Sequence, residues 1–271
     1  MKVTLENISH SFGSKPVINQ ISLDVPKGEV FSLIGPNGAG KTTTMRLIYG
    51  DLKLQKGRIT IDGSQPDTKL KERIAVMTED RLTFGRFKGE DYVRMWKMLY
   101  PNWNDKIFSS FATHYKFELE GKVSTYSMGI KTLFNLALCL STGAELLILD
   151  EPTQNLDPII RAETLNVIRD FVNNEQKTVI ISSHEIYELE EISTSFAIIR
   201  EGDVLYSDTI DEAKEKHRIV ESGEKVPVGN VIGVVNNQTL LKTEDEIGSY
   251  PTFNQIVLGY LQGRKSFVPF Q

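Results

Sequence analysis

Apolar and polar residues alternate in short runs near the start of the chain. The runs at residues 3–8 and 21–25 place apolar side chains mostly at every second position, which is typical of half-exposed β-strands. A third run at residues 58–61 leads into Asp62-Gly63, a pair that favours a tight turn. The pattern therefore predicts an antiparallel β-subdomain in the N-terminal part of the chain.

Continuous apolar runs of strand length follow at residues 30–34, 74–77, 146–149 and 178–181. Such runs are typical of strands that are buried on both faces of a parallel sheet. A helical segment at residues 158–172 joins the last two runs, as in a βαβ unit, and a hairpin at 196–206 follows them. The runs therefore predict an α/β core.

Helical spacing interrupts this core from about residue 87. Apolar side chains recur there at intervals of three and four positions, which places each set on one face of a helix. Pro101-Asn102 separates the two helices. We expect the two stripes to form the core of a helical subdomain at about residues 87–140. The stripes consist of Tyr92, Met95, Trp96 and Leu99, and then of Phe108, Phe111, Ala112 and Tyr115.

The character of the sequence changes again after about residue 213. A charged connector leads to apolar runs at residues 231–235 and 239–241, which indicate a small β-containing extension. We therefore divide the chain into a domain at residues 1–212 and a C-terminal extension at residues 213–271.

A glycine-rich loop joins the apolar run at residues 30–34 to a predicted helix. Its Gly-four-Gly-Lys-Thr spacing lets backbone amides surround a β-phosphate, with Lys41 reaching the β/γ oxygens and Thr42 free to ligand Mg²⁺. A helix N-terminus also favours anions, because its first amides are unpaired and its dipole is positive there. The candidate phosphate-binding residues are Gly35, Pro36, Asn37, Gly38, Ala39, Gly40, Lys41, Thr42 and Thr43.

Two carboxylates, Asp150 and Glu151, end the apolar run at residues 146–149. In a fold with a phosphate-binding loop, an Asp at the end of a strand serves the Mg²⁺ beside the phosphates. The following Glu can polarise a water molecule that is aligned with the γ-phosphate. Two acids at a strand end are often surface residues, but next to the phosphate loop we interpret them as a metal site and a general base.

Composition limits the classes of function. The 271 residues are 40% hydrophobic, and no apolar run approaches the roughly 18–20 residues that span a bilayer. No signal peptide opens the sequence, so we expect a soluble protein. The net charge of −5 without a long basic block disfavours nucleic-acid binding. The one cysteine, Cys139, lies in an apolar stretch and is expected to be a core residue in a reducing, cytosolic compartment.

Further motifs follow the phosphate loop in order. They are Tyr126-Ser127-Met128-Gly129-Ile130, Asp150-Glu151-Pro152-Thr153, Asn155-Leu156-Asp157 and Ser183-His184. Their order and separations resemble the nucleotide-binding domain of an ATP-binding cassette (ABC) protein over about residues 1–212. The resemblance implies a P-loop NTPase (RecA-like) core with an N-terminal antiparallel β-subdomain and an inserted helical subdomain. It also implies ATP and Mg²⁺ as cofactors.

The resemblance assigns roles to single residues. Phe12 matches the aromatic residue that stacks on adenine, and Asp157 matches the loop that communicates across a dimer. Ser127 and Gly129 match the signature that contacts the γ-phosphate from the opposite subunit. His184 matches the switch histidine that hydrogen-bonds the γ-phosphate, so that the expected catalytic residues are Glu151 and His184.

The sequence departs from the family pattern at two places. Met128 and Ile130 stand where the signature usually has Gly and Gln, although the two phosphate-contacting residues remain. Glu79 stands where the family has a Gln ligand to Mg²⁺. A carboxylate also offers oxygen to a hard cation, but it adds negative charge near the phosphates. We expect Thr42, Glu79 and Asp150 as metal ligands with altered coupling at Glu79; the alternative is that Glu79 faces solvent on a loop.

Because the chain has one set of motifs, the resemblance implies a head-to-tail dimer with a second copy or a paralogous subunit. It also implies an integral membrane subunit, which would place the chain in the cytoplasm at the inner face of the cell membrane. Phe84 and Phe87 are candidate contacts to that subunit, or they pack internally.

The leading function is the ATPase subunit of a transporter, and details of the helical block resemble Gram-positive exporters of antimicrobial or toxin peptides. The alternative is a soluble cassette ATPase that serves a cytosolic scaffold, such as one for iron–sulfur assembly. Cassette proteins of translation or DNA repair usually have two cassettes or a long coiled-coil insertion, and this sequence has neither. A kinase or GTPase would not need Ser127, Gly129 and His184 in this order.

Overall fold

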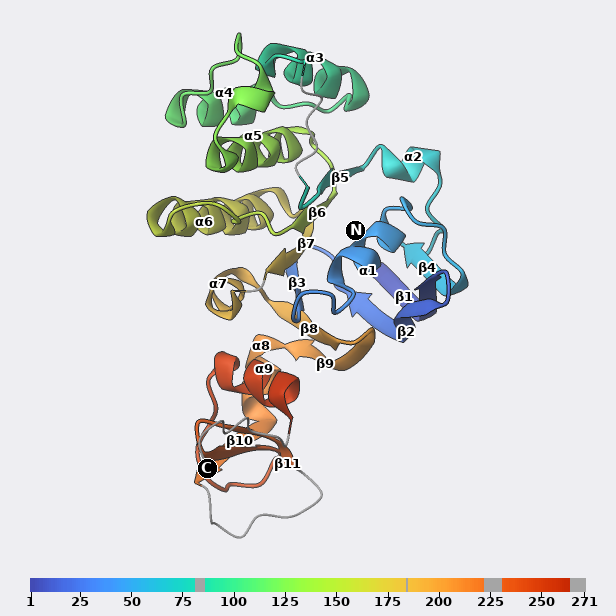
Figure 1. Cartoon of the computed structure of the whole chain (residues 1–271), viewed down its shortest axis with the longest axis vertical. Helices are drawn as coiled ribbons and strands as arrows, with labels where there is room; N and C mark the ends of the chain where they lie inside the picture. The colour runs from blue at the N-terminus through green and yellow to red at the C-terminus, as the bar shows by residue number, and fades with distance from the viewer. Residues whose placement is uncertain (81–85, 184, 222–230, 264–271) are drawn as a thin grey trace.

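The computed structural model describes residues 1–80, 86–183, 185–221 and 231–263 of the chain. Figure 1 shows a helical block at one end, a sheet in the middle, an N-terminal β-subdomain beside that sheet and a C-terminal extension at the other end. This arrangement confirms the predicted α/β fold. Within the described residues, no helix has the length and apolar character needed to cross a bilayer.

The N-terminal β-subdomain is antiparallel, as predicted, with the strand order β2-β1-β4. Its strands are β1 (Val3–Phe12), β2 (Lys15–Val25) and β4 (Lys56–Ile61). β1 and β2 extend beyond the predicted runs, and their pairing shifts register between Leu5 and Ile8, between Ile8 and His10 and between His10 and Ser11. Each shift interrupts the alternation of side chains between the two faces of the sheet.

The central sheet has the strand order β5-β6-β7-β3-β8-β9. Its pairs are parallel up to β8, and β9 is antiparallel to β8, which confirms the predicted hairpin. The strands are β3 (Val30–Ile34), β5 (Ile74–Met77), β6 (Leu146–Asp150), β7 (Thr178–Ser183), β8 (Ser195–Arg200) and β9 (Asp203–Thr209). β3, β6 and β7 are buried along their whole length, as expected for parallel strands covered on both faces.

Helices cover both faces of this sheet. The helices next to it are α1 (Lys41–Ile48), α6 (Pro158–Glu175) and α7 (Ile186–Ile192), and the short α2 (Thr68–Lys71) precedes β5. Side chains of β3 point alternately to two hydrophobic clusters: Phe31 packs in the cluster that contains Met45 of α1, and Ile34 in the cluster that contains Leu165 of α6. The central strand thus joins the two cores, and its end supports the loop that follows.

The helical block consists of α3 (Gly89–Leu99), α4 (Asp105–His114), the 3-10 turn η1 (Val123–Thr125) and α5 (Met128–Ser141). Phe134 of α5 is fully buried and makes edge contacts with Tyr92, Phe117 and Tyr126 at 5.5–6.0 Å between ring centroids. Phe108 of the predicted α4 stripe packs at the same centre. The predicted aromatic stripes are therefore core residues here.

The prediction that Leu99 lies in this core is wrong, since Leu99 is 66% exposed. Leu99 is the last residue of helix α3. Tyr100 turns inward instead, stacking on Trp96 at 5.4 Å and donating its hydroxyl hydrogen to the Ile74 carbonyl at 3.0 Å. Periodicity places Leu99 on the same helix face as Trp96, but it does not show where the helix ends.

Cys139 lies on α5 within the main hydrophobic cluster, which confirms its prediction as a core residue. Burial raises the pKa of its thiol far above the usual range, because the thiolate would lose its hydration. The side chain is therefore an inert, small apolar residue in the native protein.

The C-terminal extension contains the predicted strands and a helix that was not predicted. Its sheet has the order β10-β12-β11, with β10 (His217–Glu221), β11 (Val231–Val235) and β12 (Gln238–Lys242). Helix α9 (Phe253–Gln262) starts with a capping box between Thr252 and Gln255, a signal that the sequence contains. Phe253 of α9 packs edge-on against Phe196 of β8 at 4.8 Å, so the extension shares a core with the central sheet.

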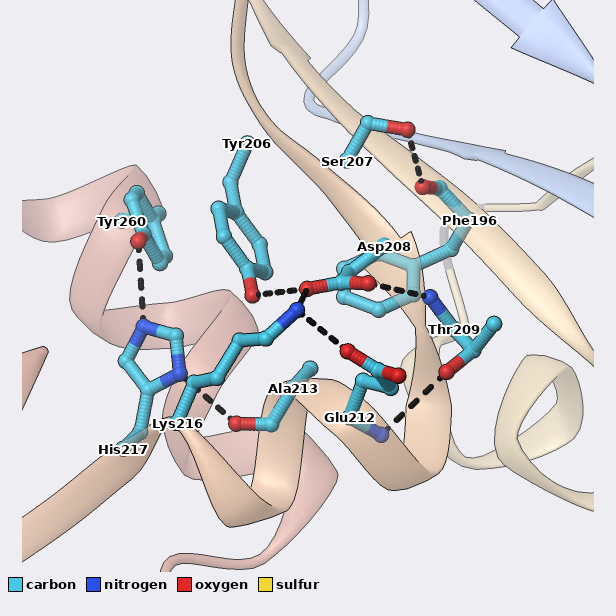
Figure 2. A network of polar contacts seen from close by, with 10 residues as sticks. All are labelled: Phe196, Tyr206, Ser207, Asp208, Thr209, Glu212, Ala213, Lys216, His217 and Tyr260. Atoms are coloured by element: carbon cyan, nitrogen blue, oxygen red, sulfur yellow. Dashed lines mark hydrogen bonds and ion pairs between the residues drawn. The ribbon is translucent and has the colours of Figure 1, made fainter. Parts of the chain in front are cut away.

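A polar network at this junction is shown in Figure 2. Asp208 of β9 accepts hydrogen bonds from the Tyr206 hydroxyl at 2.7 Å and from Lys216 at 2.9 Å, where Lys216 follows α8 (Ile210–Glu215). His217 is buried, and burial lowers the pKa of its imidazole, which favours the neutral ring. Its Nδ1 donates to the Ala213 carbonyl at 2.7 Å, and its Nε2 accepts from the Tyr260 hydroxyl at 3.0 Å. The predicted division at residue 212 falls within α8 and stays a prediction.

Candidate functional site

The phosphate loop lies between the buried strand β3 and helix α1, in the predicted setting. Two of its positions favour glycine for different reasons, close backbone approach at Gly35 and a positive φ at Gly40. A Cβ on Gly35 would lie 2.1 Å from the Ile199 carbonyl oxygen, and Gly40 has φ 111 with a Cβ position 2.8 Å from the Ile18 side chain. The loop can therefore keep its tight curve and present its amides at the start of α1.

A cavity of about 620 Å³ opens in front of this loop. The predicted loop residues from Asn37 to Thr43 line it, together with Glu79, Asp150 and Glu151. Residues from the start of β2 and from the β8–β9 turn complete its wall. These further lining residues, which sequence reasoning missed, are Lys15, Pro16, Val17 and Glu201.

Lys41 is 7% exposed and lies in the wall of this cavity. Its ammonium group donates to the Gly35 carbonyl at 2.7 Å and to the Pro36 carbonyl at 3.4 Å. Burial lowers the pKa of Lys41, and the carboxylates of Glu151, Asp150 and Glu79 act in the opposite direction. A phosphate in the cavity would offer this cation charged acceptors, which bind an ammonium more strongly than carbonyls do.

Asp150 and Glu151 are both buried at the end of β6. The Ser182 hydroxyl donates to the Asp150 carboxylate, and the Glu151 amide donates to Ser182 at 3.1 Å to its hydroxyl and 3.2 Å to its carbonyl. Glu151 has φ 50, a left-handed conformation that is costly for this residue type. Strain of this kind gathers at functional sites, where the surrounding structure holds it in place.

An oxygen-rich corner joins this cavity to a neighbouring one of about 330 Å³. Thr42, Glu79 and Asp150 line both cavities. Hydroxyl and carboxylate oxygens are the ligands that Mg²⁺ prefers, and Mg²⁺ takes few protein ligands when phosphates and water complete its octahedron. The three predicted metal-binding residues therefore fit an ion that is shared with a polyphosphate.

Ser127, Gly129 and Asp157 lie at the starts of two helices outside the cavity. Ser127 caps α5 by accepting from the Ile130 amide at 3.2 Å, and Asp157 caps α6 by accepting from Ile159 and Ile160 at 3.1 Å. A Cβ on Gly129 would lie 3.1 Å from the Asn155 carbonyl oxygen, which places the start of α5 against that loop. Of the described residues that line the cavity, none belongs to this group.

The remaining predicted residues are placed as follows. Phe12 ends β1, is 48% exposed, contacts His10 at 4.9 Å and pairs with Lys15 of the cavity wall. Phe87 is exposed and contacts Tyr92 at 6.1 Å. His184 and Phe84 lie outside the described residues.

Comparison with known proteins identifies the family. The ABC transporter family matches residues 18–154. The chain belongs to the ABC transporter family. It is 30% identical over 208 residues to the linearmycin resistance ATP-binding protein LnrL of Bacillus subtilis, covering 74% of this chain and 67% of that protein. It is 29% identical to the lantibiotic transport ATP-binding protein SrtF of Streptococcus pyogenes, covering 76% of this chain and 90% of that protein.

Solved structures agree with this assignment at the level of the fold. The structure of an ATP-binding subunit of an ABC transporter superposes with a TM-score of 0.71, at 23% identity, over 79% of this chain and 92% of that chain. The family match and the relatives together identify an ABC transporter ATP-binding subunit, similar to proteins named for linearmycin resistance and lantibiotic transport. The phosphate loop, Asp150 and Glu151 are the parts of this ABC fold that the tertiary structure brings to one cavity.

Proposed function

We propose that the chain hydrolyses Mg²⁺·ATP as one half of a head-to-tail dimer that drives a separate membrane subunit. The observation that supports this proposal most is the division of the predicted site. Lys41, Asp150 and Glu151 share a cavity, whereas the start of α5 with Ser127 and Gly129 lies on another surface. A second subunit can bring such a helix start to the open side of the cavity, where its amides face the phosphate.

In this proposal different residues of the cavity bind the phosphates, accept the proton and hold the metal ion. The loop amides and Lys41 hold the β- and γ-phosphates, and Phe12 supports the adenine. Glu151 accepts a proton from the water that attacks the γ-phosphate, while its backbone is held by Ser182. Bound Mg²⁺ would neutralise charge on the β/γ oxygens, held by Thr42, Asp150 and Glu79. His184 is proposed to hydrogen-bond the γ-phosphate, and Asp157 to contact the partner subunit.

Dimer formation is expected to require ATP and Ser127. In a Glu151→Gln background, in which ATP persists, ATP should shift the sedimentation of the protein from monomer to dimer. Adding Ser127→Arg should keep the protein monomeric because the long cation blocks the start of α5, and ATP binding should remain. A dimer that forms equally well with Ser127→Arg would contradict the head-to-tail arrangement.

The transported substrate is proposed from the relatives. Relatives whose names state lantibiotic transport and linearmycin resistance support export of antimicrobial peptides or toxic compounds. The membrane subunit would hold the chain at the cytoplasmic face of the membrane. The alternative is a soluble cassette ATPase on a cytosolic scaffold, and fractionation of the native protein decides between them, since only the transporter subunit co-purifies with an integral membrane protein.

Glu79 is proposed to tune the dependence on Mg²⁺. It lines both cavities with Thr42 and Asp150, and its charge acts on Lys41. Glu79→Gln should raise the Mg²⁺ concentration for half-maximal ATP hydrolysis about threefold, a modest effect because the exposed carboxylate is screened by water. Asp80→Asn is the matched control, since Asp80 lines only the smaller cavity and should leave the Mg²⁺ titration unchanged. Identical Mg²⁺ titrations for Glu79→Gln and the wild type would contradict the proposal that Glu79 tunes the dependence on Mg²⁺.

A further inference from the structure

Glu188 is a buried carboxylate on helix α7 that does not line the cavity. It is 9% exposed, and its helix begins two residues after position 184. The family resemblance assigns no role to Glu188, and Glu188 is not among the residues that line the cavity. A buried carboxylate is unfavourable unless it is paired, and an apolar side chain would fill such a position at lower free energy.

The carboxylate of Glu188 makes contacts with separate segments of the chain. One oxygen accepts from the Thr153 hydroxyl at 2.8 Å and from the Ser183 hydroxyl at 3.3 Å. The other oxygen forms an ion pair with Arg161 at 3.1 Å. These partners lie on the loop after β6, at the end of β7 and in the first turns of α6.

Each of these segments leads to a residue that the proposed mechanism uses. Thr153 lies two positions after Glu151, and the turn between them is closed by a hydrogen bond from the Gln154 amide to the Glu151 carbonyl at 3.1 Å. Ser183 directly precedes position 184. Arg161 lies one turn after Asp157 and also donates to the Leu156 carbonyl at 3.4 Å.

The loop from Glu151 to Asp157 also contains two residues with positive φ, Glu151 and Asn155. Such a loop has other arrangements of lower local energy, so tertiary contacts must select the one observed. The Thr153 hydrogen bond is the contact from Glu188 that reaches the loop closest to Glu151. The carboxylate of Glu188 thereby connects this loop to the end of β7 and to α6.

We propose that Glu188 is a positioning residue for ATP hydrolysis. Its carboxylate holds the loop after Glu151 and the end of β7 in one arrangement, with Arg161 as its counter-ion. Glu188 itself does not touch the nucleotide. The proposal rests on the proposed ATPase function, because its effect on rate requires Glu151 to act as the general base.

The first test compares Glu188→Gln with Glu190→Gln. Glu190 is the matched control, because it is on the same helix but pairs outward with Lys214 at 2.9 Å. Glu188→Gln should lower kcat about tenfold through misplacement of Glu151 and leave KM for ATP within about twofold. Glu190→Gln should leave both constants unchanged, and equal kcat values for the two variants would overturn the proposal.

The second test separates positioning from stability. The double variant Arg161→Met with Glu188→Met replaces the ion pair by apolar side chains, which commonly keeps or raises stability. We expect a melting temperature near that of the wild type together with a kcat that stays about tenfold low. If kcat recovers with the melting temperature, Glu188 is only a structural residue and the proposal is wrong.

A third measurement does not depend on turnover. Amide hydrogen exchange of residues 151–157 should be faster in Glu188→Gln than in the wild type or in Glu190→Gln, because a neutral amide cannot accept from Thr153 and pair with Arg161 at the same time. Unchanged exchange there would overturn the proposal even in a chain with no measurable hydrolysis. A wild-type chain that binds ATP and does not hydrolyse it would instead contradict the proposed function.

Discussion

Glu151→Gln is expected to reduce ATP turnover by about 10²- to 10⁴-fold, the range that a positioned general base contributes. The buried carboxylate of Glu151 lies in the same cavity as Lys41, with its backbone fixed by Ser182. The amide of Gln has nearly the same shape and cannot accept the proton of the attacking water. ATP binding should therefore persist, since the phosphate loop is unchanged.

The matched control for this variant is Glu145→Gln. Glu145 stands at the opposite end of β6, where its carboxylate pairs with Arg73 at 2.8 Å on the surface. Steady-state phosphate release and equilibrium binding of labelled ATP measure the two expected effects. Near-normal hydrolysis by Glu151→Gln would exclude Glu151 as the general base, whatever the control shows.

Lys41→Met is expected to weaken ATP binding about a hundredfold. A charge-assisted hydrogen bond contributes about 1.5–3 kcal/mol, and a loss of 1.4 kcal/mol corresponds to about tenfold in affinity. Met keeps the unbranched shape of the side chain and removes the cation that faces the phosphates. Titration calorimetry with ATP measures the change.

The melting temperature of Lys41→Met shows whether weaker ATP binding results from unfolding of the variant. Burial lowers the pKa of Lys41, which means that the folded protein disfavours its charged form. Lys41→Met should therefore unfold at a temperature equal to or above that of the wild type in the absence of nucleotide. Lys71→Met, at an exposed position of α2, should leave both ATP affinity and melting temperature unchanged. Wild-type affinity in Lys41→Met would contradict the assignment of this loop to phosphate binding.

The parts of the fold that were predictable depend on local patterns. Buried parallel strands are continuous apolar runs, and β3, β6 and β7 lie where such runs stand. The phosphate loop was recognisable because its geometry favours glycine, through close backbone approach at Gly35 and a positive φ at Gly40. Helix α9 was not predicted, although the sequence contains the signal for its start, the capping box between Thr252 and Gln255.

Other features had no signal in the sequence. Leu99 fits the helical stripe and is nevertheless exposed at the last residue of α3, next to Tyr100, which turns inward. Lys15 at the start of β2 and Glu201 in the β8–β9 turn are brought to the cavity wall from distant parts of the sequence. Their proximity to the phosphate loop depends on how the β-subdomain packs against the central sheet.

The sequence by itself determined the family, the phosphate loop and the identity of the carboxylates at the end of β6, because each depends on residue type and spacing along the chain. Only the tertiary structure decided that Ser182 holds Asp150 and Glu151, since this depends on the register of β6 against β7. It alone decided that Glu188 joins Thr153, Ser183 and Arg161. The role of a buried carboxylate depends on the residues that it contacts. For Glu188 these residues are distant in the sequence, so only the packing of the chain brings them together.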